Sequence, residues 1–297
     1  MNFLKNGITK CGKIFNETDC RKLLREIYNL RDFNTLFLSQ KIWKSKKFDN
    51  LKKNPGPGRN LLHKLETQFI FENKNFIKIM SKVLGDNYRI LDFKLVMAVP
   101  KHLMPKWVLA ITENDHTVNL GEFILPQYRD ITYFRGIDFH QDIIDYPTRN
   151  PDFITAYIYL ENVDKNSSPL HIVPNSHLLG ASVYPHKIEK FNKNLINYKS
   201  NKKNLISKFS ILTGRQGSLN YWHPYLLHGT QPHKKDVARI SVRLLIEKNR
   251  QVVIGCDLDK LNDNIKNKKT LKIYNKEFSK NGINKKRNFI NKLDEKG

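Results

Sequence analysis

Short β-rich segments separated by turns occupy the middle of this chain, and they limit its possible folds more than any other feature of the sequence. They run from about residue 88 to residue 247. Within 153–161, small aliphatic side chains alternate with mainly aromatic ones, a period of two that is typical of a strand with both faces covered. Many short strands after helices predict a mainly β, α+β fold with a barrel or jelly roll as its core. The predicted strands are 89–99, 107–112, 131–142, 153–161, 170–174, 217–222 and 238–247.

Two amphipathic helices are predicted before these strands, over 16–30 and 74–84. Asn16 can cap the first helix, and Gly85 follows the end of the second. We expect residues 1–87 to buttress one sheet of a core formed by residues 88–250, within one domain. Residues 184–209 are rich in Lys and Asn with little periodicity, which predicts a basic insertion between strands. Residues 251–297 are also basic and predict a helical or frayed C-terminal extension outside the core.

The formal net charge of +24 is compatible with a nucleic acid or a membrane surface as partner. However, lysine outnumbers arginine 39 to 13 and forms no stripe with it, whereas proteins that read bases and phosphates favour the bidentate Arg fork. Abundant Lys, Asn and Ile are what AT-rich coding would give. We therefore favour codon composition over nucleic-acid binding as the origin of the charge, which can still favour an anionic substrate.

The cysteines Cys11, Cys20 and Cys256 are odd in number and lack C-x-x-C spacing. This argues against a disulfide framework or a zinc site and fits a reducing compartment. The N-terminus lacks the apolar run of a signal peptide, and no stretch approaches the roughly 20 apolar residues of a membrane span. We expect a soluble, cytoplasmic protein.

A histidine and an aspartate two residues apart, His140 and Asp142, are the first indication of chemistry. On a strand, residues two apart point to the same face, so both side chains would project together while Gln141 points away. They would form two of the three ligands of a facial triad, the arrangement that holds non-haem Fe(II) with open coordination positions. For the third ligand, His223 and His228 compete within 217–232.

Arg239 begins a β-branched segment that predicts a strand. A guanidinium buried in a barrel requires an anion to offset its desolvation, and a dicarboxylate cosubstrate would supply a bidentate partner. By parity, Ser241 and Arg243 share the face of Arg239. Arg243 would therefore either recognise an acidic substrate inside the barrel or reach solvent at the end of the strand.

Four motifs occur in a fixed order along the chain. They are Phe-His-Gln-Asp at 139–142, Tyr-Leu-Glu-Asn-Val at 159–163 with 168–177 ending in Pro-Asn-Ser-His, Leu-His-Gly-Thr-Gln-Pro at 227–232, and Arg239, eleven residues after His228. Together they resemble the phytanoyl-CoA dioxygenase family of Fe(II)- and 2-oxoglutarate-dependent oxygenases, closely over roughly 130–245 and loosely over the N-terminal helices. Asn175 replaces the family's usual Gly, and Asn tolerates the left-handed backbone of such a turn.

The resemblance implies a double-stranded β-helix, a jelly-roll, cupin-like core with flanking N-terminal helices. It also selects His228 over His223 as the third ligand of Fe(II), beside His140 and Asp142. Related halogenases have a small residue at the position of Asp142, so a carboxylate there implies hydroxylation or a related C–H oxidation.

The family's reaction uses O2 and 2-oxoglutarate and yields succinate and CO2. The resemblance implies that Arg239 and Thr230 bind the C5 carboxylate of 2-oxoglutarate, and that an unactivated C–H of a small-molecule or acyl-type substrate is hydroxylated. The intact set of residues speaks against a non-catalytic binding protein on the same fold. A nucleic-acid-binding or nucleic-acid-modifying protein that uses the basic surface is the other alternative.

Further residues are candidates for the site, and each also has a plausible structural role. Aromatic residues near strand ends, for example, are as often packing residues as pocket residues. The candidates for the substrate pocket are Gln141, Tyr146, Trp222 and Arg243. The candidates for additional 2-oxoglutarate contacts are Lys94, Arg129 and Tyr133. The histidines expected to be structural are His171, in the core, His177, bonded to backbone in a loop, and His223, beside Trp222.

Overall fold

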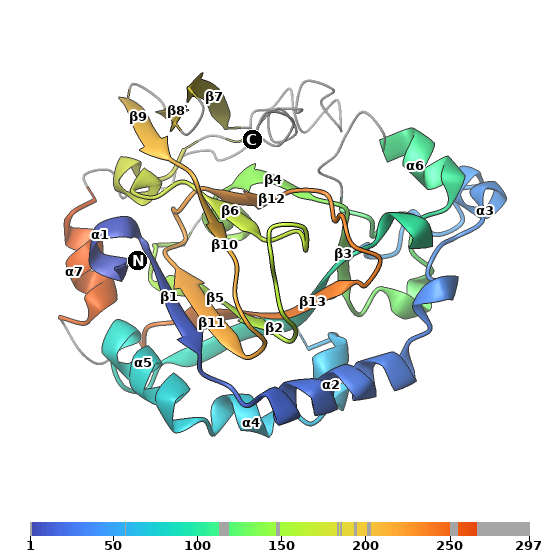
Figure 1. Cartoon of the computed structure of the whole chain (residues 1–297), viewed down its shortest axis with the longest axis horizontal. Helices are drawn as coiled ribbons and strands as arrows, with labels where there is room; N and C mark the ends of the chain where they lie inside the picture. The colour runs from blue at the N-terminus through green and yellow to red at the C-terminus, as the bar shows by residue number, and fades with distance from the viewer. Residues whose placement is uncertain are drawn as a thin grey trace.

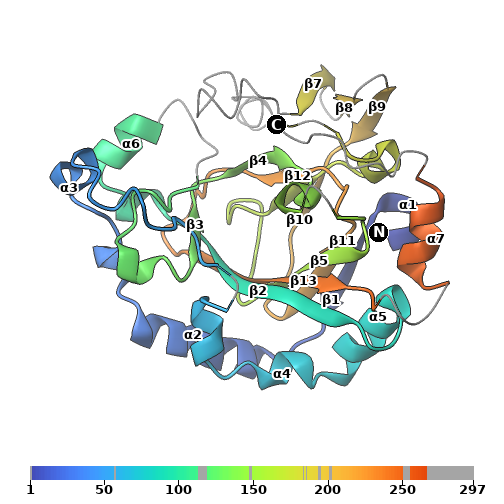
Figure 2. The ribbon, with the colours of Figure 1, turned by 180° about the vertical axis from the view of Figure 1, so that it is seen from behind.

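The computed structural model describes residues 2–56, 58–112, 119–146, 149–182, 184, 186–192, 195–200, 203–249 and 255–265. Two β-sheets face each other and enclose a barrel-like core, and helices lie outside the larger sheet (Figure 1). The view from behind shows the same arrangement, with α2 and α4 beneath the larger sheet (Figure 2). The predicted double-stranded β-helix with flanking N-terminal helices is confirmed.

The larger sheet contains, in spatial order, β1 (Ile8–Lys13), β11 (Ser218–Trp222), β5 (Phe153–Tyr159), β13 (Arg239–Glu247), β2 (Arg89–Ala98) and β3 (Thr132–Phe134). All neighbouring strands are antiparallel except β2 and β3, which are parallel. The central strands β5 and β13 are buried along their whole length, because one face meets the helices and the other faces the barrel interior.

The smaller sheet contains, in spatial order, β10 (Ser210–Leu212), β6 (Leu170–Ile172), β12 (His228–Thr230) and β4 (Ile137–His140), all antiparallel. The predicted strand 131–142 is therefore wrong as one element. Its first half is β3 in the larger sheet and its second half is β4 in the smaller one, so the chain changes sheets at Arg135 and Gly136.

A third sheet lies in the segment expected to be a basic insertion, 184–209. It consists of β7 (Lys187–Asn192), β8 (Leu195–Ser200) and β9 (Lys203–Lys208), paired in sequence order beyond one end of the smaller sheet (Figure 1). Ile196 and Tyr198 on β8 are fully buried against Val173 and Leu227 of the core. The weak periodicity of this segment did not reveal a sheet. β8 has a regularly buried face, whereas β9 is exposed or partly exposed along its whole length.

The two predicted helices are α2 (Glu17–Leu30) and α5 (Lys74–Leu84). Asn16 caps α2, because its Oδ1 accepts from the Thr18 N–H at 3.0 Å. Gly85 ends α5 with φ of 80° and ψ of 164°, a positive-φ conformation that glycine adopts without a Cβ penalty. The apolar faces of both helices pack against the outer face of the larger sheet.

The remaining helices are α1 (Phe3–Asn6), α3 (Gln40–Lys44), α4 (Gln68–Phe71), α6 (Lys106–Thr112) and α7 (Asp257–Asp263). The predicted strand 107–112 is wrong, because these residues form α6. Short apolar runs do not distinguish strand from helix by periodicity, and Pro105 stands just before the first turn, where its missing N–H costs nothing.

The two ends of the described chain pack against the rest of the domain. The N-terminal segment contributes a strand, β1, to the edge of the larger sheet, whereas only helices were predicted there. Near the other end, α7 packs against α1 and α5, while residues 266–297 of the expected C-terminal extension lie outside the described residues. Within the described ranges, no helix combines the length and apolar character needed to cross a membrane.

Candidate metal centre and cosubstrate pocket

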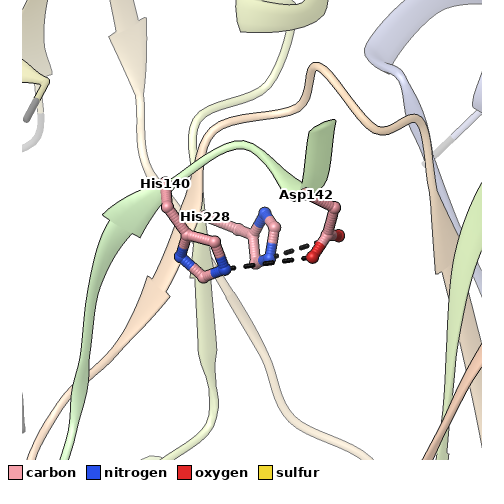
Figure 3. Close-up of side chains that lie close together, drawn as sticks. All are labelled: His140, Asp142 and His228. Atoms are coloured by element: carbon pink, nitrogen blue, oxygen red, sulfur yellow. Dashed lines mark ion pairs between the residues drawn. The ribbon is translucent and has the colours of Figure 1, made fainter. Parts of the chain in front are cut away.

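The side chains of His140, Asp142 and His228 lie close together (Figure 3). His140 is the last residue of β4, His228 is the first residue of β12, and the two are direct partners in the register of these strands. The distance between His140 Nε2 and Asp142 Oδ1 is 3.9 Å, and that between His228 Nε2 and Asp142 Oδ2 is 3.5 Å. One ligand atom from each residue lies within 4.8 Å of the other two. The structure therefore brings together the three residues that the family motifs selected.

The backbone at Gln141 explains why His140 and Asp142 converge. Asp142 begins a 3-10 turn rather than continuing the strand, but Gln141 is still extended, with φ of −111° and ψ of 135°. The alternation expected of a strand therefore holds across these three residues. The buried Gln141 side chain points the other way. It donates to the carbonyls of Gly180 (3.0 Å) and Tyr225 (2.7 Å) and accepts from the Ser182 N–H (2.9 Å), so it joins backbone segments behind the metal ligands.

Backbone carbonyls orient both imidazoles. His140 Nδ1 lies 2.8 Å from the Asp138 carbonyl, and His228 Nδ1 lies 2.9 Å from the Leu226 carbonyl. A carbonyl accepts only, so each Nδ1 carries the proton and each Nε2 presents a lone pair. Burial lowers the pKa of His228 to about 4, which keeps this ring neutral near pH 7. Both rings are thus prepared to bind a cation through Nε2.

Three donors converge on the Asp142 carboxylate. Thr155 Oγ1 donates to Oδ2 at 2.7 Å, Trp222 Nε1 donates to the same oxygen at 2.8 Å, and Arg243 Nη2 donates to Oδ1 at 2.7 Å. Burial alone would raise the pKa of this carboxyl. At the acidic pH where it titrates, however, protonated His228, the Arg243 guanidinium and protonated His140 outweigh burial and hold the pKa below its ordinary value. Asp142 is therefore an oriented carboxylate at neutral pH.

This donor set fits non-haem iron. Two neutral imidazoles and one carboxylate on one side of a site are the ligands of a facial triad, which leaves positions open for other ligands. The competing histidine, His223, lies elsewhere. Its Nδ1 accepts from the Tyr225 N–H at 3.1 Å, its Nε2 faces Asn262 Oδ1 at 3.0 Å, and it is fully buried. His223 thus has the structural role that was expected of it.

Arg239 lies deeper in the barrel and is only 1% exposed. Its guanidinium donates to the carbonyls of Ser167 (3.2 Å) and Ser168 (2.9 Å) and to Ser241 Oγ (2.9 Å), and it lies over the Phe134 ring. Within the described ranges, these hydrogen-bond acceptors are all neutral. A buried guanidinium whose hydrogen bonds all go to neutral acceptors is suited to a further, anionic partner, and this position is compatible with a bond to the far carboxylate of 2-oxoglutarate.

Thr230 shares the inward face of His228. The pairing of β12 with β6 is regular, so residues two apart on β12 project to the same side. The pairing of β12 with β4 is irregular, but the extra residue lies on β4, so the alternation along β12 is kept. Thr230 Oγ1 accepts from the Ile137 N–H at 2.9 Å, which leaves its own proton available to donate. This position is compatible with a hydrogen bond to the cosubstrate carboxylate.

Arg243 does not reach solvent, because it is only 8% exposed and its guanidinium turns inward to Asp142. The solvent-exposed alternative for this residue is therefore wrong. Trp222 is fully buried and also contacts Asp142, so it holds a metal ligand. Tyr146 stacks edge-on against Phe153 with ring centroids 5.4 Å apart, at the margin of the outer apolar cluster.

The three candidates for further 2-oxoglutarate contacts differ in location. Arg129 is bound to loop carbonyls, including that of Ile124 at 2.9 Å, outside the barrel. Tyr133 packs in the outer cluster, on the face of β3 opposite to Phe134. Lys94 is the register partner of Arg243 on β2 and thus has the parity of the inner face.

The structure also shows the surroundings of His171, His177 and Asn175. His171 is buried on β6 as expected, with its ring stacked against Phe209. His177 is fully buried, but neither ring nitrogen has a hydrogen-bond partner among the described residues, so the expected backbone bond is absent. Asn175 adopts the left-handed conformation, with φ of 68°, that its position in the turn was expected to require.

Sequence reasoning missed residues that support the ligands. Thr155 was treated only as part of a strand, although parity with the other inward residues of β5 could have found it. His186, just before β7, forms a network with Ser182 Oγ and Tyr198 OH at 3.0 and 3.1 Å. Burial lowers the pKa of His186, and His140 and His228 lower it further when they are protonated, which indicates that the third sheet lies near these two histidines.

A jelly-roll barrel with an oriented His-Asp-His site and a buried arginine below it defines a non-haem iron, 2-oxoglutarate-dependent oxygenase. The family model of phytanoyl-CoA dioxygenase matches residues 3–241. The chain belongs to the phytanoyl-CoA dioxygenase family, and its cofactors are iron and 2-oxoglutarate.

Individual relatives are distant. A probable alpha-ketoglutarate-dependent hypophosphite dioxygenase of Stutzerimonas stutzeri is 21% identical over 248 residues, which cover 80% of this chain and 73% of that protein. Among solved structures, AviO1 from Streptomyces viridochromogenes Tue57 is 13% identical, covering 84% of this chain and 92% of that one, with a TM-score of 0.48. HygX from Streptomyces hygroscopicus, with nickel and 2-oxoglutarate bound, is 10% identical, covering 84% of each chain, with a TM-score of 0.46.

Proposed function

We propose that this protein hydroxylates an unactivated C–H bond of a small molecule or acyl-type substrate that carries negative charge. The observation that carries the proposal is the carboxylate of the site, Asp142. Asp142 supplies a carboxylate, held by three donors, at the position where related halogenases have a small residue. A bound carboxylate occupies the space that a halide would need, so transfer of oxygen to the substrate is favoured.

The chain's own residues would bind, orient and exclude water. Bound iron with 2-oxoglutarate and O2 supplies the oxidation, in which one oxygen atom enters succinate and the other enters the substrate. His140, His228 and Asp142 would hold the metal on one side, so the remaining positions face the barrel interior. Arg239 and Thr230 would fix the far carboxylate, and the buried surroundings exclude water from the reacting groups.

The charge balance inside the barrel supports an anionic substrate. Fe(II), Arg239 and Arg243 carry positive charge, whereas Asp142 and the two carboxylates of 2-oxoglutarate carry negative charge, which leaves one net positive charge at the centre. Glu161, which interacts electrostatically with Arg239, lies beyond the end of β5 and is partly exposed, so solvent screens its charge more than that of the buried groups. The relative from Stutzerimonas stutzeri is named for a small oxyanion, hypophosphite, which agrees with this preference.

A panel of substrates in matched pairs tests the proposal. Each carboxylate or phosphonate is assayed beside its neutral amide or ester for 2-oxoglutarate-dependent succinate formation, with the product mass measured under 18O2. We expect the anionic member to stimulate succinate formation and the product to gain one labelled oxygen atom. A product that lacks hydrogen but gains no oxygen would contradict hydroxylation, and equal stimulation by neutral members would contradict the charge preference.

The same preparation separates the alternative functions. A non-catalytic binding protein would retain iron and 2-oxoglutarate without forming succinate. A protein that acts on nucleic acid would be retained on DNA in a salt-dependent manner. We expect succinate formation and no retention on DNA even at low salt.

A further inference from the structure

Asn220, on β11, is a buried amide with unmet hydrogen-bonding capacity. Its side chain is fully buried, and neither Oδ1 nor Nδ2 has a hydrogen-bond partner among the described residues. Buried polar groups in folded proteins are nearly always hydrogen-bonded, because an unsatisfied one loses its hydration without compensation. An amide with both atoms unsatisfied is therefore available to bind a ligand or a water molecule, and its position decides between them.

Strand alternation directs Asn220 into the barrel. Trp222, two residues further along β11, donates to Asp142, so this face of β11 is the one that faces the metal ligands. Asn220 is the register partner of Tyr157 on β5, and Tyr157 is the register partner of Arg243 on β13. These three side chains form one row across the inner face of the larger sheet.

The row lies between the metal ligands and Arg239. Asp142 contacts Thr155 and Trp222, which are register partners on neighbouring strands, so its carboxylate lies at their level. The row is two residues further along the strands, toward the end of the barrel that holds Arg239. Arg239 itself is four residues beyond Arg243 on β13, about 13 Å at the usual rise of a strand. A dicarboxylate that spans the metal and Arg239 has to pass this row, close to its metal-binding end.

We propose that Asn220 is a cosubstrate-binding residue that donates from Nδ2 to the C1 carboxylate of 2-oxoglutarate, at the end that chelates the metal. Arg239 holds the opposite end. Arg243 adds positive charge near the same carboxylate. Its Nη2 is 2.7 Å from Asp142 Oδ1, and Asp142 and the C1 carboxylate would bind the same metal. A guanidinium has donors on three nitrogens, so Arg243 keeps donors beyond the one that Asp142 uses. The inference depends on the use of 2-oxoglutarate and is independent of the identity of the primary substrate.

Calorimetric titration of 2-oxoglutarate into the anaerobic Fe(II) protein tests this role. Asn220→Leu removes both polar atoms and keeps the branched, four-atom side chain. We expect it to weaken 2-oxoglutarate binding by about tenfold or more, the effect of one lost hydrogen bond to a charged group. Asn220→Asp keeps the shape but places a carboxylate against a carboxylate, so it should weaken binding further. Affinity for Fe(II) alone should stay unchanged in Asn220→Leu.

Asn60→Leu is the matched control. Asn60 is also a buried asparagine with an unpartnered Nδ2, but its Oδ1 accepts from Leu62 and Leu95 backbone outside the barrel interior. Its replacement should leave the affinity for 2-oxoglutarate intact.

A double variant gives a second test. When Asn220→Leu is combined with Arg239→Met, the two losses of affinity should multiply, because the residues act at opposite ends of the ligand.

Three results would overturn the assignment. Wild-type affinity for 2-oxoglutarate in both Asn220 variants would show that the amide binds only water. A raised KM for the primary substrate with unchanged 2-oxoglutarate affinity would place the amide in the substrate site. Failure of the wild-type protein to bind 2-oxoglutarate would refute the family function itself, and this outcome is distinct from the other two.

Discussion

Replacement of Arg239 by Met separates the binding of 2-oxoglutarate from the stability of the fold. The guanidinium is 1% exposed and its hydrogen-bond acceptors among the described residues are neutral, so we expect the far carboxylate of 2-oxoglutarate to be its anionic hydrogen-bond partner. Loss of one partner of a buried, hydrogen-bonded charge pair costs about 2–5 kcal/mol of binding. The Kd for 2-oxoglutarate should therefore rise by about 30-fold or more.

The assay is the shift in Tm that 2-oxoglutarate causes in the metal-loaded, anaerobic protein. At a ligand concentration 100 times the wild-type Kd, binding stabilises the native state by about 2.7 kcal/mol. A 30-fold weaker Kd reduces this to under about 1 kcal/mol. Because 1 kcal/mol corresponds to about 2–4 °C in a domain of this size, the shift should fall from about 5–10 °C to below about 4 °C.

Arg129→Met is the control for burial of an arginine as such. Arg129 is 7% exposed and is also held by backbone carbonyls, but it lies outside the barrel. This variant should have a changed Tm without ligand and the full ligand-induced shift. An Arg239→Met protein that keeps the full shift would refute the assignment of Arg239 to the cosubstrate.

Three further predictions concern the ligands and the fold. Trp222→Phe removes a hydrogen bond to Asp142 and should weaken Fe(II) binding about 10–100-fold in equilibrium dialysis; unchanged affinity would deny Trp222 this role. Gly229→Ala would place a Cβ 2.7 Å from the Ile137 carbonyl oxygen and push β12 away from β4. It should lower the free energy of unfolding in urea by about 1–3 kcal/mol and weaken Fe(II) binding. Wild-type values for both would argue against this close contact. Burial lowers the pKa of His177 in the folded protein from its ordinary value of 6.5 to about 4. As the pH falls from about 6.5 to about 4, the unfolded chain therefore binds a proton at His177 before the folded protein does, and the folded state loses stability. His177→Leu should therefore flatten the stability–pH profile in this range by about 1.4 kcal/mol per pH unit, and an unaltered slope would exclude the contribution of His177.

The metal site was accessible to sequence analysis because its residues occur within short motifs. His140 and Asp142 are separated by one residue, and the extended backbone at Gln141 keeps both on one side whether or not the strand continues. The choice of His228 over His223 needed the family pattern, since spacing alone left both open. The structure agrees with that choice because His223 is engaged with Tyr225 and Asn262.

The surroundings of the metal site were not accessible, because they depend on the register between distant strands. A slip of one residue would turn Asn220 and Trp222 away from the barrel, and nothing in a single strand fixes the register with its neighbours. For the same reason Arg243 was left between substrate and solvent, whereas it donates to a metal ligand 101 residues away in sequence. The strand predicted at 107–112 failed because a short apolar run also suits a helix.

Binding of Fe(II) by three single-histidine variants tests the central claim most directly. Anaerobic titration of folded His140→Ala, His228→Ala and His223→Ala proteins, followed by an assay of succinate formation, compares two proposed ligands with one histidine that faces Asn262. We predict that His140→Ala and His228→Ala lose tight Fe(II) binding and succinate formation, while His223→Ala keeps much of both. Equal loss in all three variants, or retention of Fe(II) by His228→Ala, would contradict the assignment of the metal centre.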